Sequence, residues 1–117
     1  MKQTSVVKIV YPGERVIFDI KIEGSTREEI LENTFAAFNH GSGREHETLE
    51  GRPGCRSMSK NDLVQVDGVW FQCESFGWKE VTEEYVNEID SEVRRHPLYK
   101  EHGAWFALSD VMYQKRK

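Results

Sequence analysis

Long apolar runs are missing from this sequence of 117 residues, and none approaches the roughly 18 apolar residues that a membrane span needs. The first residues, Met1 to Ser5, also lack the apolar segment of a secretory signal peptide. We therefore expect a cytoplasmic protein without membrane contact. The length predicts a single compact domain covering residues 1–117.

Cysteine is scarce as well: the sequence has two, Cys55 and Cys73, and neither belongs to a Cys-x-x-Cys pair. Zinc-ribbon and redox-motif interpretations therefore find no support, and we expect no functional disulfide. Cys73 lies in an apolar, strand-like run and is predicted to be buried. Cys55 lies in a loop rich in glycine, proline and arginine, where exposure is expected.

Neither sign of charge dominates, because 16 basic and 20 acidic side chains leave a net charge of −4. This balance is too mild for a mimic of nucleic acid and has the wrong sign for a basic nucleic-acid binder. The charges are uneven, however: residues 80–92 contain six acids and no base, and residues 52–60 contain three bases and no acid. This pattern predicts a dipolar surface.

The first part of the chain is predicted to form a hairpin and a helix. Residues 4–11 are apolar and β-branched, and residues 15–23 alternate, with Val16, Phe18, Ile20 and Ile22 on one face. Between them, Pro12-Gly13 suits a type II turn. A capping box at Ser25 or Thr26 then begins a helix, which the segment 39–43 ends.

The remainder of the chain is predicted to repeat this order after a long loop, residues 39–60. Asp67-Gly68 is typical of a type I′ turn between strands 63–66 and 69–76, the second ending before Gly77. Thr82 caps a helix over residues 83–95, which His96-Pro97 ends. Residues 97–102 are expected to form a surface turn, 104–108 a short fifth strand, and 110–115 a last helical turn.

These elements predict an α+β fold of order β-β-α-β-β-α. Hairpins separated by helices are typical of a mostly antiparallel sheet, here of four or five strands, with two helices packed on it. Most of the 38% hydrophobic content falls into the two hairpins and the two helix stripes, which argues against disorder.

One short motif stands out, the segment 56–64 with the sequence Arg-Ser-Met-Ser-Lys-Asn-Asp-Leu-Val. It resembles the Arg-Ser-Leu-Ser-Val-Gly-Asp-Val-Val signature of the YodL-like domain, and the resemblance extends over residues 38–81. The match departs at Lys60-Asn61, where relatives carry Val-Gly. Because asparagine tolerates the left-handed conformation, the turn is expected to survive this change.

The resemblance implies a small accessory protein of bacteriophages, plasmids and other mobile elements of bacteria. Such a protein would act on host defence or on the element's own DNA metabolism, and the family brings no defined activity with it. The signature also has a purely structural interpretation, which we favour. Ser57 and Ser59 can hydrogen-bond to nearby backbone groups in a turn that sets how the chain enters the next hairpin.

Catalytic and metal-binding patterns are weak. His40 and His46 lie beside glutamates in the long loop, but their spacing matches no compact ligand motif. Ser57, Ser59 and Cys55 share that loop with these histidines without a nucleophile elbow or an ordered triad. We therefore predict no enzymatic activity, no metal and no cofactor, and we keep a small hydrolase or metal protein as the third hypothesis.

Binding is the favoured function, and a protein partner is the first choice. A small domain without a catalytic pattern acts most simply through its surface, as a monomer or a homodimer. The predicted protein-binding residues are Arg52, Arg56, Ser57, Ser59, Lys60, Trp78 and Trp105.

Nucleic-acid binding is the alternative. The basic loop 44–60 could contact phosphates while nearby aromatic rings, those of Trp70, Phe71 and Trp78, stack on bases. Against this stand the net negative charge and the acidic helix. The basic residues that it would use are Arg44, Arg52, Arg56 and Lys60.

Overall fold

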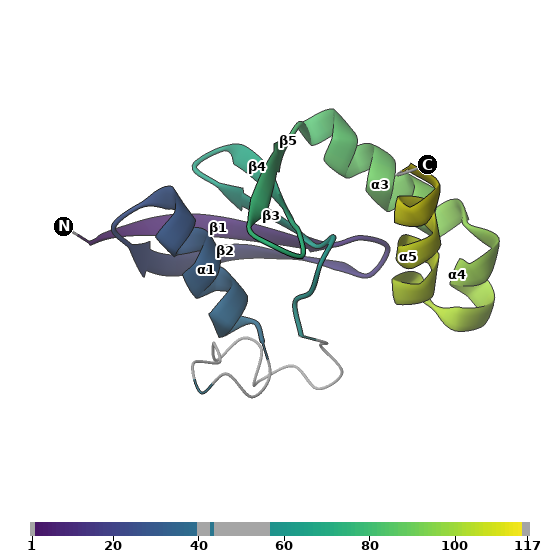
Figure 1. Cartoon of the computed structure of the whole chain (residues 1–117), viewed down its shortest axis with the longest axis horizontal. Coiled ribbons are helices and arrows are strands. Elements are labelled where there is room, and N and C mark those ends of the chain that lie inside the picture. The colour runs from purple at the N-terminus through teal and green to yellow at the C-terminus, as the bar shows by residue number, and fades with distance from the viewer. Residues whose placement is uncertain (1, 40–42, 44–56, 116–117) are drawn as a thin grey trace.

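A computed structural model describes residues 2–39, 43 and 57–115 of the chain. These residues form an antiparallel sheet of five strands in the order β2-β1-β3-β4-β5, together with four helices. The α+β class and the mostly antiparallel sheet are therefore confirmed. Figure 1 shows α1 against the β1–β2 hairpin, while the other helices gather beside the turn of that hairpin.

The N-terminal hairpin pairs β1 (Gln3–Tyr11) with β2 (Arg15–Gly24). Its turn has the predicted type II features, because Gly13 has a φ of +76° and the Glu14 amide donates to the Tyr11 carbonyl oxygen at 2.9 Å. Val7 pairs with Ile20 and Ile9 with Ile17, so one extra residue forms a bulge in β2.

This bulge corrects the predicted alternation of β2. Ile17, Ile20 and Ile22 face the core, whereas Val16 is exposed. An extra residue in one strand exchanges the faces beyond it, so a strict period of two cannot hold along the whole strand. The prediction for Phe18 concerns a side chain outside the described part of the molecule.

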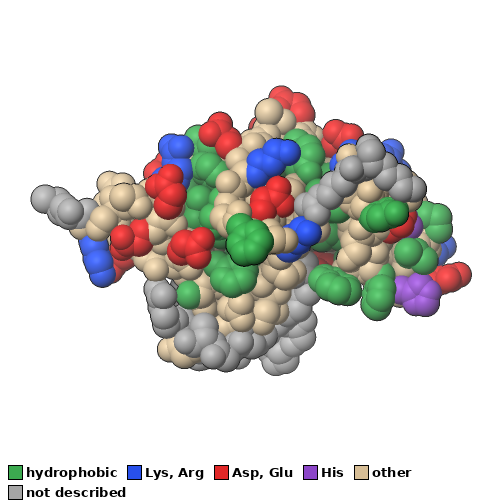
Figure 2. Space-filling model, in the orientation of Figure 1, with side chains coloured by type: hydrophobic (Ala, Val, Ile, Leu, Met, Phe, Trp, Pro, Cys, Tyr) green, Lys and Arg blue, Asp and Glu red, His purple; other side chains and the backbone are tan. Residues whose placement is uncertain are grey.

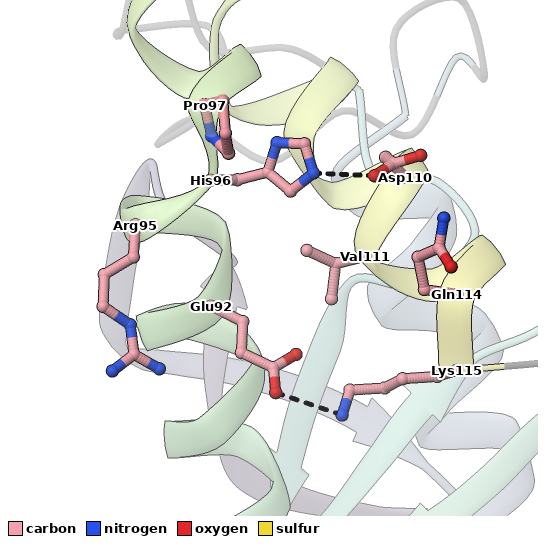
Figure 3. Close-up of a pocket in the computed structure, with 8 residues that line it drawn as sticks. All are labelled: Glu92, Arg95, His96, Pro97, Asp110, Val111, Gln114 and Lys115. Carbon is pink, nitrogen blue, oxygen red and sulfur yellow. Dashed lines mark hydrogen bonds and ion pairs between the residues drawn. The ribbon is translucent and has the colours of Figure 1, made fainter.

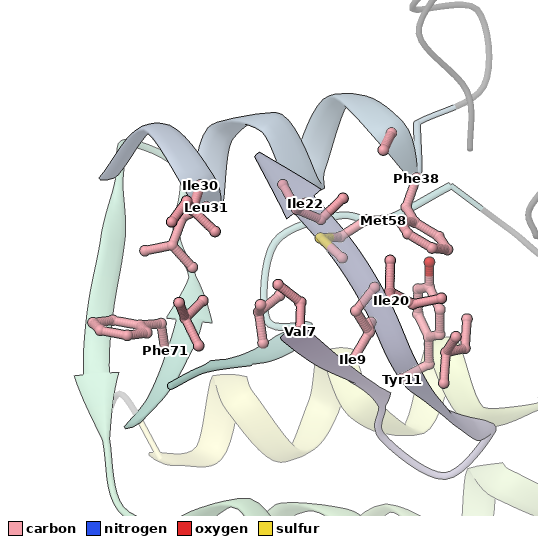
Figure 4. Close-up of a cluster of buried hydrophobic side chains, with 14 residues drawn as sticks. Val7, Ile9, Tyr11, Ile20, Ile22, Ile30, Leu31, Phe38, Met58 and Phe71 are labelled. Carbon is pink, nitrogen blue, oxygen red and sulfur yellow. The ribbon is translucent and has the colours of Figure 1, made fainter. Parts of the chain in front are cut away.

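Helix α1 (Arg27–Ala37) covers one face of the sheet. It begins at Thr26, whose hydroxyl oxygen accepts a hydrogen bond from the Glu29 amide at 3.1 Å. Its apolar side packs on β1, β2, β3 and β4 to form the main core (Figure 4), which includes Leu31, Phe38 and Met58. Met58 precedes β3, so the signature segment takes part in this core.

The second hairpin joins β3 (Leu63–Val66) to β4 (Val69–Cys73) through Asp67 and Gly68, with φ of +50° and +83°. Two positive φ values are the mark of the predicted type I′ turn. The predicted extension of the second strand to Phe76 is wrong. The chain turns over residues 74–77 and returns as β5 (Trp78–Val81), which pairs with β4 and is the fifth strand of the sheet.

Helices α3 (Glu83–Arg95), α4 (Pro97–His102) and α5 (Ala104–Lys115) follow. The bounds of α3 and its cap at Thr82 are as predicted. The predictions of a surface turn at 97–102 and of a strand at 104–108 are wrong, because both segments are helical. Two packed helices were expected, whereas the described residues form four. A short apolar run fits strand and helix alike, and here it continues at helical spacing through Leu108, Val111 and Met112 into a cluster with α3.

The three helices meet the sheet at two places. Val86 packs with Val10, Leu63 and Trp70 on the face of the sheet opposite α1. At the hairpin turn, the Gly13 amide donates to Asp90 Oδ1 at 2.7 Å, and the Tyr99 hydroxyl donates to the Gly13 carbonyl oxygen at 2.8 Å. These contacts of Gly13 with Asp90 and Tyr99 are the joint between the sheet and the helices. They bring α5 to the same side of the molecule as the segment that leads into β3.

Candidate functional site

The signature segment forms a tight turn before β3. The carboxylate of Asp62, which is fully buried, accepts a hydrogen bond from the Ser59 amide at 2.8 Å, and Asn61 has the left-handed φ of +79°. The Asn61 amide donates to the Cys73 carbonyl oxygen at 2.7 Å, and the Cys73 amide donates to the Asp62 carbonyl oxygen at 2.9 Å. The turn therefore fixes how the chain enters the hairpin, and the Asp62 side chain makes the side-chain contact to the backbone that was predicted for the serines.

The outer side of this turn lies across a groove from α5. The groove has a volume of about 340 Å³. One wall is the turn itself, and the other consists of α5 residues at helical spacing. Its lining residues are Ser59, Lys60, Asn61, Trp105, Leu108, Ser109, Met112 and Tyr113.

The α5 wall combines an apolar floor with exposed aromatic rings. Leu108 and Met112 are buried in the helical cluster, whereas the side chains of Trp105 and Tyr113 are 48% and 61% exposed. Phe106 stands edge-on to Trp105 with the ring centroids 5.5 Å apart, so the aromatic surface continues past the rim of the groove. Figure 2 shows hydrophobic side chains at the surface over this helical end of the molecule.

Three of the predicted protein-binding residues thus lie together: Ser59, Lys60 and Trp105. Sequence analysis did not identify the other α5 residues of the groove, Leu108, Met112 and Tyr113 among them. Their spacing from Trp105 is the pattern that could have revealed them. That spacing indicates one helix face only when residues 104–115 are treated as a single helix.

Other predicted residues lie elsewhere. Trp78 packs partly buried against the main core and donates its indole N–H to Glu32 Oε1 of α1 at 3.0 Å. Ser57 is half-buried and does not line the groove. The remaining predictions fall outside the described residues, namely Arg44, Arg52 and Arg56 for binding, His40 and His46 for a metal, and Cys55.

Two of the three aromatic rings invoked for nucleic-acid stacking are buried. Trp70 and Phe71 are buried on opposite faces of the sheet, under α3 and α1 respectively. Arg27 lies over the Phe71 ring, 5.4 Å from its centroid. Neither ring presents a face for stacking on a base, whereas Trp78 is partly exposed and Trp105 and Tyr113 are exposed beside Lys60.

A second cavity, of about 440 Å³, lies between the ends of α3 and α5 (Figure 3). His96 Nε2 lies 2.7 Å from Asp110 Oδ2, and His96 Nδ1 accepts a hydrogen bond from the Leu98 amide at 3.1 Å. A neutral imidazole that accepts a hydrogen bond at Nδ1 carries its proton on Nε2, so the Nε2–H group donates a hydrogen bond to Asp110. Nδ1 therefore caps the start of α4, and Nε2 joins this cap to α5.

An ion pair between α3 and α5 lies at the other end of this cavity. Lys115 Nζ contacts Glu88 Oε1 at 3.1 Å and Glu92 Oε1 at 3.3 Å, and the hydrogen bond with Glu88 raises the pKa of the lysine. Val111 lies between the two charged contacts in Figure 3. The contacts of His96 with Asp110 and of Lys115 with Glu92 thus join the ends of α3 to α5, which suits a connection between helices.

Burial raises the pKa of the Cys73 thiol to about 12, so this sulfur is protonated at neutral pH and is a weak nucleophile. No group of three His, Cys, Asp or Glu side chains within residues 2–39 and 57–115 could hold a metal ion. Over the same residues, no helix is long and apolar enough to cross a membrane.

No protein-family model, curated protein or solved structure matches this chain. The resemblance of residues 38–81 to the YodL-like domain therefore stays a prediction. The functional argument depends on the groove and on the residues that line it.

Proposed function

We propose that this protein is a non-enzymatic accessory module that binds a partner protein through the groove between the signature turn and α5. The observation that carries the proposal is the placement of Trp105 and Tyr113, half-exposed on one helix face, beside Lys60. Tryptophan and tyrosine are enriched among the residues that dominate binding energy, because they bury a large area at little cost in side-chain entropy.

The sequence resemblance extends this proposal. A YodL-like accessory protein of a phage or plasmid would act in the cytoplasm of its bacterial host, on a host protein or on a protein of the element itself. A rigid turn facing a helix suits such a role, since pre-organised walls reduce the entropy lost on binding.

Affinity capture from a bacterial lysate with matched variants tests the proposal. We expect wild-type protein to retain a specific partner and Trp105→Ala to weaken its binding about 30-fold, as for a hot-spot residue worth about 2 kcal/mol. Phe76→Ala is the control, because Phe76 is 97% exposed on the β4–β5 turn and does not line the groove. Equal binding by wild type and Trp105→Ala would contradict the proposal, and so would the absence of a specific partner.

Single-stranded nucleic acid is the second candidate, and the same groove favours it. A base stacked on Trp105 or Tyr113 would contribute roughly 1–3 kcal/mol, and Lys60 could contact a phosphate. A gel-shift series over a range of salt concentrations separates the two candidates. Absence of a shift at low salt removes nucleic acid, because phosphate contacts are strongest there.

A further inference from the structure

The charge of the groove indicates what kind of segment it accepts. Lys60 is its charged lining residue, and no carboxylate lines it within the described part of the chain. The nearby carboxylate of Asp62 is turned into the protein and accepts the Ser59 amide. Lys60 itself makes no hydrogen bond or ion pair to the residues that the structure describes. A cation with no carboxylate among the described residues that line the groove beside it is complementary to an acidic side chain.

The length of the groove sets the size of that ligand. Trp105 and Tyr113 are eight residues apart on α5, which corresponds to about 12 Å along a helix with a rise of about 1.5 Å per residue. An extended peptide advances about 3.3 Å per residue, so about four residues span this distance. Leu108 and Met112 form an apolar floor between the two rings, and a large apolar side chain could cover it.

Polar groups on the α5 wall can orient a peptide backbone. The Ser109 hydroxyl donates to the Trp105 carbonyl oxygen at 3.0 Å, which leaves the lone pairs of its oxygen available to accept a peptide amide. The groove therefore combines a cation, an apolar floor and a hydrogen-bond acceptor within the length of a few residues.

We infer that the groove takes a short acidic peptide segment of the partner protein, with an aspartate or glutamate side chain at Lys60 and a large apolar side chain between Trp105 and Tyr113. This inference rests on the proposed function, because it names the part of the partner that the groove would hold.

Selection from a peptide library tests it. The full chain is the probe, and the library consists of acetylated and amidated octapeptides with one fixed leucine or phenylalanine and randomised flanks. Blocked ends remove the terminal charges, so that side-chain carboxylates alone supply acid. We expect wild-type protein to enrich aspartate or glutamate at a constant spacing from the apolar residue.

Charge reversal gives the decisive comparison. Lys60→Glu should replace the preference for acidic peptides by a preference for peptides with lysine or arginine. The ratio of the affinity for the acidic peptide to that for the basic peptide should fall at least about tenfold, since facing like charges repel. Lys100→Glu is the matched control, because Lys100 is exposed on α4 and does not line the groove. It should select the same peptides as wild type. Circular dichroism shows whether each variant is folded.

The possible failures differ from one another. If Trp105→Ala abolishes selection but wild type shows no acidic preference, or if Lys60→Glu leaves that preference unchanged, the inference is overturned and the proposed function stands. If Trp105→Ala selects the same peptides as wild type, or if wild type selects none, both the inference and the proposed function are overturned. A labelled oligothymidylate that binds more tightly than any peptide, and loses binding in Trp105→Ala, overturns the inference in favour of nucleic acid.

Discussion

The sheet with α1 and the group formed by α3, α4 and α5 differ in the size of their cores and in where their exposed apolar side chains lie. Among the described residues, the main core under α1 contains fourteen buried side chains, and the helical cluster contains seven. The sheet half leaves Val6, Val16 and Phe76 exposed on three separate segments, whereas the helical half exposes Trp105, Phe106 and Tyr113 on the single helix α5. The sheet half therefore supplies the larger core, while α5 gathers its exposed rings beside a groove.

The two halves also differ in how they are held. Strand ladders fix the backbone of the sheet, so its core cannot readily contract around a lost side chain. The helices are joined to the sheet mainly through the Gly13 turn and the packing of Val86. We therefore expect the helical half to respond to mutation more independently than the sheet.

The largest expected effects come from a matched pair of core truncations. Ile9→Ala in the sheet core should lower the free energy of unfolding by about 4 kcal/mol, and Ile89→Ala in the helical cluster by about 2.5 kcal/mol, because helices can shift to fill part of the cavity. Urea unfolding measures both values. A larger loss in Ile89→Ala would reverse the comparison.

The joint between the halves should be sensitive to a single methyl group. A Cβ on Gly13 would lie 2.5 Å from Val93 Cγ1 at a φ of +76°, so Gly13→Ala should cost about 3 kcal/mol. Gly68→Ala is the control, because its φ is +83° and a Cβ there would meet nothing within 4 Å.

The control variant should lose only about 1 kcal/mol, the cost of the backbone conformation alone. Hydrogen exchange should also show that Gly13→Ala lowers protection in α3, α4 and α5 more than in β1 and β3. Equal losses in the two glycine variants would mean that the close approach to Val93 does not hold the halves together.

A smaller effect is expected at the start of α4. His96→Ala removes the acceptor of the Leu98 amide and the contact with Asp110, and should cost about 1 kcal/mol. His96→Asn retains a good capping residue and should recover part of that loss. Chemical denaturation measures both variants. No difference between them would indicate that the contact with Asp110, rather than the cap, stabilises this corner.

The smallest effect concerns the signature turn. At Asn61, with φ of +79°, substitution by glycine should change the free energy of unfolding by less than about 0.5 kcal/mol, and substitution by alanine should lower it by about 1 kcal/mol. Thermal unfolding resolves the two variants. A stable Asn61→Ala variant would show that the left-handed conformation is not needed to form this wall of the groove.

Much of the local structure could be predicted from residues close together in the sequence. Turns at Pro12-Gly13 and Asp67-Gly68, caps at Thr26 and Thr82, and the left-handed Asn61 follow from chemistry that acts over a few residues. The segment 97–115 could not, because its short apolar run fits either a strand or a helix until α3 is available to pack against. The bulge in β2 was missed for a similar reason, since it appears only in the pairing with β1.

The groove shows the same division between local and long-range determinants. The residue types alone favour a turn at residues 59–62, because asparagine tolerates a left-handed φ and the Asp62 carboxylate can accept the amide three residues before it. The hydrogen bonds of Asn61 and Asp62 with Cys73 depend instead on the pairing of this segment with the end of β4. Only the tertiary structure decided that Lys60 faces Trp105 and Tyr113. That meeting requires the β4–β5 return and the docking of the helices at Gly13, both of which depend on contacts between residues far apart in the chain.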